Sequence, residues 1–136
     1  MQQPDPFVYH APTEITAPKY AAIRAAEVDA RAAIQKQIGG SWQGEAWTDR
    51  PGDRDTQMAY TAISDACRAF HAAIVEQAPP SPDRSAAERC VRLARMAANE
   101  AVTASTDEVL ELRRQCLNNL RAARWQACAA IALQSA

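Results

Sequence analysis

The amino-acid sequence predicts an all-α protein of one domain. Its 136 residues fall within the usual size of a single domain. Alanine, the strongest helix former, is the most frequent residue, and apolar residues recur at helical spacing in four segments. Glycine occurs only four times, always between residues 39 and 52, which excludes glycine-rich phosphate loops elsewhere in the chain.

The expected elements begin with an extended arm over residues 1–15, where three prolines disfavour a helix. A first helix is predicted over residues 16–38, with Thr16 as its N-cap and Gly39 ending it. Its apolar residues follow the spacing of one helix face. A loop containing the glycines and two tryptophans follows over residues 39–56.

Residues 57–104 are predicted to form a helical hairpin. Consecutive prolines end its first arm, and Ser81, followed by a proline, is a suitable N-cap for its second arm. Residues 105–136 are predicted to be a C-terminal helix. Ser105 opens it in a capping box with a glutamate three residues later, or the two helices are continuous.

The apolar side chains are small. Leucine, isoleucine, valine and phenylalanine together number 21, which gives the predicted helices little volume for a core of their own. We therefore expect a homo-oligomer in which burial between subunits supplies part of the stability.

The charge pattern is dominated by arginine. Of 15 basic residues only Lys19 and Lys36 are lysines, and arginine offers phosphates a planar fork of donors. The formal net charge of −1 and the sequence pI of about 6.1 argue against a duplex-DNA binder. The sequence contains neither an apolar run of membrane-spanning length nor a signal pattern, so a cytoplasmic location is expected.

The four cysteines do not form a metal motif. Cys67, Cys90, Cys116 and Cys128 lack metal-ligand spacing and are expected to be reduced thiols in helices. Cys67 and His71 share a helix face, but Cys67 belongs to an apolar stripe and no orienting group lies nearby in the sequence. We therefore expect that the protein is not an enzyme and that it binds neither a metal ion nor a cofactor.

The hairpin's second arm carries the strongest functional pattern. Four arginines recur over three turns, at Arg84, Arg89, Arg92 and Arg95. Arg84 and Ser85 fall in the first turn, where free backbone N–H groups favour an anion. These residues would bind phosphates, although the same pattern is also typical of a solvated helix surface.

A resemblance to a known family sharpens this interpretation. The resemblance lies in residues 79–102, PPSPDRSAAERCVRLARMAANEAV. This segment begins with a pair of prolines, continues with Arg84 followed by Ser85, and contains the motif Met96-x-Ala-Asn99 near its end. The segment resembles the second hairpin arm of phage cyclic-nucleotide sponges, the Thoeris and CBASS anti-defence proteins. The segment YTAISDACRAFHAAI resembles the first arm, and FVYHAPTE at residues 7–14 resembles the family's N-terminal arm.

The resemblance implies a protein that sequesters immune second messengers without turning them over. Its ligands would be cyclic dinucleotides, cyclic trinucleotides or cyclic ADP-ribose isomers, held between the protomers of a symmetric oligomer, often a hexamer. The site of action would be the cytoplasm of an infected bacterium. The chain departs from the family pattern at Cys90 and Ala97, where lysine and tryptophan are common.

By position in the motif, Arg84 and Ser85 would contact phosphate or ribose, and Asn99 a base or sugar edge. Tyr9 would stack on a base, with Arg24 or Arg68 as its basic partner. The complete set of candidate ligand-binding residues is Tyr9, Arg24, Arg68, Arg84, Ser85, Arg89, Arg92, Met96 and Asn99.

Two other functions remain open from the sequence. One is a helical assembly or adaptor protein whose apolar faces are its whole function and which has no small-molecule ligand. The other is a single-strand nucleic-acid binder, suggested by the arginines together with Trp42 and Trp47.

Overall fold

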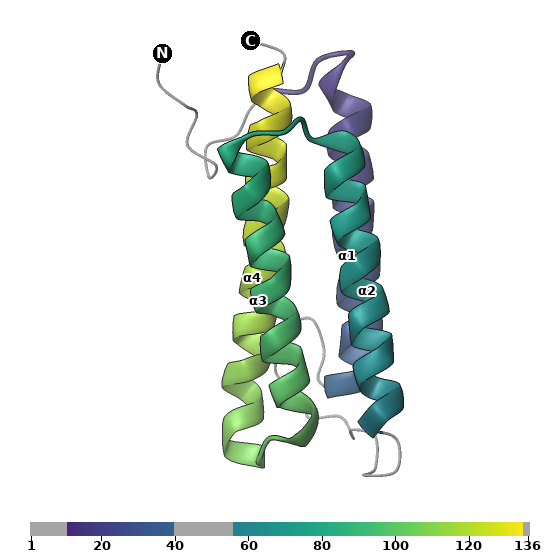
Figure 1. Cartoon of the computed structure of the whole chain (residues 1–136), viewed down its shortest axis with the longest axis vertical. Coiled ribbons are helices and arrows are strands. Elements are labelled where there is room, and N and C mark those ends of the chain that lie inside the picture. Colours follow the sequence, from purple (N-terminus) through teal and green to yellow (C-terminus); the bar gives the residue numbers. More distant parts are fainter. Residues whose placement is uncertain (1–10, 40–55, 135–136) are drawn as a thin grey trace.

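The computed structural model describes residues 11–39 and 56–134. Every regular element in this part of the chain is an α-helix, which confirms the predicted fold class. The four helices are α1 (Thr16–Ile38), α2 (Thr56–Gln77), α3 (Pro82–Thr103) and α4 (Thr106–Gln134). They run alternately down and up along the long axis of the molecule (Figure 1).

The four helices form an up-and-down bundle. Each packs against the next in sequence, and α4 returns to pack against α1. The pair α3–α4 packs most extensively, followed by α1–α2, whereas the diagonal pairs α1–α3 and α2–α4 meet little. Short connections between α2 and α3 and between α3 and α4 favour this antiparallel order. The order makes α1 and α4 neighbours although they lie at opposite ends of the sequence.

Two helix ends follow their predicted signals. The Ser81 Oγ accepts a hydrogen bond from the Arg84 backbone N–H at 3.1 Å, and Pro82 is the first residue of α3. At the end of α1, Gly39 has φ 80°, and its N–H donates to the Gln35 carbonyl at 2.9 Å. A positive φ is accessible to glycine at little cost, so Gly39 stops the helix as expected.

The predicted N-cap of α1 is wrong. The backbone of Ile15 is already helical, at φ −82° and ψ −42°, so Thr16 lies inside the helix. The capping hydroxyl belongs to Thr13, whose Oγ1 accepts from the Thr16 N–H at 3.1 Å. In return, the Thr13 N–H donates to Thr16 Oγ1 at 2.8 Å. The two threonines thus satisfy each other reciprocally, as in a capping box, so the cap lies three residues before Thr16, where α1 begins as expected.

The last two helices are separate. Ala104 leaves the helical conformation at φ −70° and ψ 155°, and the chain turns back at this point. The backbone N–H groups of Glu108 and Val109 then both donate to the Ser105 carbonyl, at 3.1 and 3.0 Å. Of the two alternatives left by the sequence, a new helix after Ser105 is therefore the one observed.

The apolar faces of all four helices meet inside the bundle. The apolar residues predicted to lie on one face of each helix are buried. On α2 they are Ile63, Cys67, Phe70 and Ile74. Alanine supplies about half of the core residues, and its small side chain lets helix axes approach closely. Because these faces cover one another within one chain, a second subunit is not needed to bury them, and the oligomer stays a prediction.

In the described ranges, no helix is both long and apolar enough to cross a membrane. The predicted tryptophan loop, with Trp42 and Trp47, lies outside the described residues, and so does most of the N-terminal arm.

Candidate anion-binding site

Four of the predicted ligand-binding residues share the outward side of α3. Ser85, Arg89, Arg92 and Met96 are spaced four, three and four residues apart, which places them on one helix face. All four are exposed, and Met96 keeps 55 % of its surface open to solvent. Neither arginine has an ion-pair partner within the described residues. We call these four residues the α3 strip.

Arg84 points away from this strip, toward the end of α2. Its Nη1 donates to the Ala78 carbonyl at 3.3 Å, and its Nε lies 3.5 Å from Glu88 Oε1. The same Glu88 oxygen is 3.7 Å from His71 Nε2 on α2. Arg84 therefore links the first turn of α3 to the end of α2. Its guanidinium has further donors, and its role toward a phosphate stays a prediction.

Asn99 lies near the other end of α3 and is half-buried. Its Oδ1 is buried and accepts no hydrogen bond from the described residues. A buried amide oxygen without a donor is costly, so a ligand donor would suit this atom, and the contact of Asn99 with a base or sugar edge stays a prediction.

Arg68 is on the outward side of α2 and pairs with Asp65 one turn earlier, Nη1 to Oδ1 at 3.4 Å. Both side chains are largely exposed, so this ion pair is worth little. Arg24 is on α1, diagonal to α3. The bundle therefore does not bring Arg24 to the α3 strip. Tyr9, the expected aromatic partner of Arg24 or Arg68, lies outside the described residues.

Arg24 instead belongs to a cluster where α1 meets α4. At its centre is Glu27, whose ionisable side chain is only 1 % exposed. Arg124 of α4 places its Nε 3.2 Å from Glu27 Oε1. Arg31 of α1 and Arg121 of α4 are also close enough to act on the carboxylate. We call these five residues, Arg24, Glu27, Arg31, Arg121 and Arg124, the α1/α4 cluster.

Burial dominates the electrostatics of Glu27. It raises the pKa of the carboxyl above its ordinary value, because the charged form loses its hydration. Arg124 opposes this shift most strongly, and the other three arginines of the cluster oppose it less. Neither carboxylate oxygen accepts a hydrogen bond from the described residues. The surrounding positive charges, rather than hydrogen bonds, are what favours the ionised form here.

Two other side chains border the cluster. The guanidinium of Arg124 lies 5.6 Å from the centroid of the Trp125 ring, within the range of a cation–π contact. Cys128 lies one turn beyond Arg124. Burial raises the pKa of the Cys128 thiol to about 11; the charge of Arg124 acts against this shift, and that of Glu27 adds to it. An indole therefore stands directly beside the cluster and would report on changes in its charge.

Arg24 is the one member of this cluster that was predicted from the sequence as a site residue. The burial of Glu27 could also have been predicted from the sequence. Glu27 follows Ile23 by four residues and precedes Ala30 by three, which places it on the apolar face of α1. A carboxylate on such a face needs a partner from another helix. Its arginine partners on α4 could not be recognised in the same way, since nothing in the sequence states that α4 packs beside α1.

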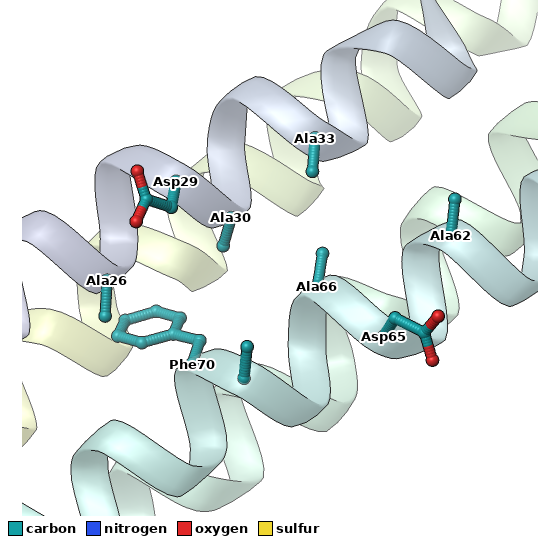
Figure 2. Close-up of a pocket in the computed structure, with 9 residues that line it drawn as sticks. Ala26, Asp29, Ala30, Ala33, Ala62, Asp65, Ala66 and Phe70 are labelled. Carbon is teal, nitrogen blue, oxygen red and sulfur yellow. The ribbon is translucent and has the colours of Figure 1, made fainter.

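A groove between α1 and α2 has a different character. It has a volume of about 540 Å³ and is lined mainly by alanines of both helices, with Phe70 beside them. Figure 2 shows Asp29 and Asp65 as the charged side chains along it. An apolar groove edged by two carboxylates does not suit a phosphate, so anion binding is better sought at the arginines.

The described residues contain no group of three histidine, cysteine or acidic side chains arranged to hold a metal ion. All four cysteines are free thiols. Comparison of the chain with protein-family models, with curated proteins and with solved structures gives no match.

Proposed function

We propose that this protein binds cyclic nucleotide second messengers and sequesters them without chemical turnover, as an anti-defence protein acting in the cytoplasm of an infected bacterium. The observation that carries the proposal is the α3 strip, where Arg89 and Arg92 extend from neighbouring turns without an ion-pair partner in the described residues. Unpaired guanidinium groups at this spacing can each form bidentate contacts with a phosphate.

The other members of the strip suit the rest of such a ligand. The Ser85 hydroxyl can donate to or accept from a ribose, and the exposed Met96 offers an apolar contact for a base. Sequestration needs a nanomolar dissociation constant, about −12 kcal/mol, to compete with an effector. A strip on one helix is open on its outer side, so a second subunit facing it, with Tyr9 stacked on a base, would enclose the ligand.

The proposal is tested by calorimetry of the full chain against cyclic dinucleotides, cyclic trinucleotides, cyclic ADP-ribose isomers and their linear counterparts. We expect one cyclic class to bind tightly and its linear form weakly. The double variant Arg89→Gln/Arg92→Gln should weaken binding about a hundredfold, roughly tenfold per lost charged contact.

Arg114→Gln is the matched control. Arg114 is an exposed arginine of α4 that pairs with Glu111, Nη2 to Oε2 at 2.6 Å, and it lies outside the strip. Its substitution removes one positive charge without touching the proposed contacts, so affinity should stay that of the wild type. Wild-type protein that binds none of the cyclic ligands would refute the proposal.

The groove between α1 and α2 favours a second candidate, a helical assembly or adaptor protein with no small-molecule ligand. Its alanine lining would allow close approach of another helix. Protein purified from its host without a bound nucleotide, which also stays unliganded at saturating messenger, would support this candidate. Binding that depends steeply on salt and ignores cyclisation would instead indicate a single-strand nucleic-acid binder.

A further inference from the structure

Two surfaces of the bundle carry complementary patterns. The groove between α1 and α2 is apolar, has a volume of about 540 Å³ and is lined mainly by alanines. Asp29 borders it from α1 and Asp65 from α2, so each helix contributes one carboxylate (Figure 2). On α3, the exposed Met96 is accompanied by Arg89 and Arg92. An apolar groove edged by two carboxylates thus matches an apolar side chain accompanied by two guanidinium groups.

The helical spacing of the α3 strip places its two arginines on different sides of its midline. Because an α-helix turns by about 100° per residue, a line drawn along α3 from Ser85 to Met96 passes between Arg89 and Arg92. A helix laid lengthwise on the groove by this strip would direct Met96 into the groove and one arginine toward each wall. The apolar stems of the arginines would add to the contact with the alanines.

The four charged groups are accessible for such a contact. Asp29, Arg89 and Arg92 are exposed and have no ion-pair partner within the described residues. Asp65 lies 3.4 Å from the Arg68 guanidinium, but both side chains are largely exposed, so this ion pair is weak and can exchange its partner. Each aspartate would gain an arginine across the interface, which leaves neither surface with unbalanced charge.

The two surfaces do not meet within one chain, because the strip is on the outward side of α3 and the groove is formed by α1 and α2. We propose that the α3 strip of one copy docks into the α1/α2 groove of a second copy. In a pair of subunits one groove and one strip remain free, so the contact is heterologous and extends into a ring or a longer chain of subunits. The contact does not rest on the function proposed for the strip, and a ligand bound there would compete with it.

The test is sedimentation velocity of the nucleotide-free full chain, from micromolar to millimolar concentration. One helix against one groove buries a small area, so a dissociation constant in the micromolar range is expected. Added salt should weaken the association, because the paired charges lie at the rim of the contact. A wild type that stays monomeric at millimolar concentration would contradict the proposal.

Charge reversal then identifies the two surfaces. The variants Asp29→Arg/Asp65→Arg and Arg89→Glu/Arg92→Glu should each weaken self-association about a hundredfold, because like charges then face each other. All four side chains are exposed, so helix content by circular dichroism should not change. An equimolar mixture of the two variants should associate again, since each reversed surface meets the opposite charge on the other variant. Association that survives in both variants, or that mixing does not restore, would contradict the proposal.

A matched pair of substitutions tests the apolar part of the contact. Met96→Ser removes the side chain that enters the groove and should weaken self-association about tenfold. Leu110→Ser is the control, because Leu110 of α4 is 53 % exposed, against 55 % for Met96, and lies outside both surfaces. Its self-association should be that of the wild type, and equal losses in the two variants would contradict the proposal. Failure of the cyclic-nucleotide proposal would appear separately, as absence of ligand binding in calorimetry whatever the oligomeric state.

Discussion

The α3 strip and the α1/α4 cluster use the same side chain in two different environments. Arg89 and Arg92 extend into solvent from a single helix, where water and salt screen their charges. Arg124 meets its partner across two helices, and that partner is almost fully buried. The strip was recognisable from its spacing in the sequence, whereas the cluster exists only because two distant segments are packed together.

Because of this difference, solvent weakens the charge interactions of the two regions to different extents. Exposed arginines on one helix attract phosphates and fix their register, but each contact is weakened by competition with water. In the α1/α4 cluster the carboxylate of Glu27 is buried, so solvent screens its attraction to Arg124 less. The two regions are therefore expected to respond differently to substitution and pH.

Arg84 is the residue whose substitution should have the largest effect, because its guanidinium is held by Ala78 and Glu88 and is largely shielded from solvent. Arg84→Ala should weaken binding of the cognate cyclic nucleotide by about 2–4 kcal/mol, and Arg84→Lys should recover only part of this. Calorimetry measures the affinity, and circular dichroism the helix content, which should not change. Wild-type affinity in Arg84→Ala would assign the residue wholly to its contacts with Ala78 and Glu88.

Cysteine reactivity compares the two regions directly, since Cys90 is on α3 and Cys128 borders the α1/α4 cluster. Burial raises the pKa of both thiols, to about 11 for Cys128 and by less for Cys90. At pH 8, iodoacetamide should therefore modify Cys90 before Cys128, because a larger fraction of Cys90 is present as the reactive thiolate. Mass spectrometry of the digested protein gives the order.

The two remaining cysteines serve as internal controls for that experiment. Cys67 and Cys116 are fully enclosed in the core, and burial raises the pKa of their thiols to about 11 and about 12. They should be modified last, and only as the protein unfolds. Early modification of either one would mean that the bundle opens far more readily than its packing implies.

Glu27 should make stability depend on pH in a way that the α3 strip does not. Because its folded pKa is raised above 4.5, the folded state keeps a proton that the unfolded chain releases as the pH rises past that value. The free energy of unfolding of the wild type should therefore fall, relative to Glu27→Gln, as the pH increases from 4.5 through the folded pKa. Urea denaturation of both proteins at several pH values measures this. Parallel curves would show that the carboxyl titrates normally.

Arg68 should show the smallest effect. Its ion pair with Asp65 is exposed on both sides, so Arg68→Ala should change the free energy of unfolding by no more than about 0.5 kcal/mol. Thermal denaturation of Arg68→Ala beside Asp65→Ala tests this, because the two variants should be equally mild. A clear loss of ligand affinity in Arg68→Ala alone would identify it, rather than Arg24, as the basic partner of Tyr9.

Most of the fold was readable from local features of the chain. Alanine content and helical spacing indicated four helices, and Ser81 and Gly39 marked ends that the structure confirms. The cap of α1 was misplaced because Thr13 and Thr16 are both suitable residues three positions apart, and only their reciprocal hydrogen bonds select Thr13. Caps depend on which hydroxyl reaches a free N–H, which spacing alone does not decide.

The candidate sites likewise differ in whether local sequence features or tertiary packing reveal them. Local features of the chain were enough to predict the helices, their buried faces and the arginines of the α3 strip, because propensity, capping and periodicity act over a few residues. The packing of α1 beside α4, and with it the position of Glu27 among four arginines, became visible only in the assembled bundle. The same is true of Arg84, which turns toward Ala78 instead of outward. The physical reason is that an apolar helix face specifies burial but not the partner that covers it, so contacts between distant charges arise only when the bundle is assembled.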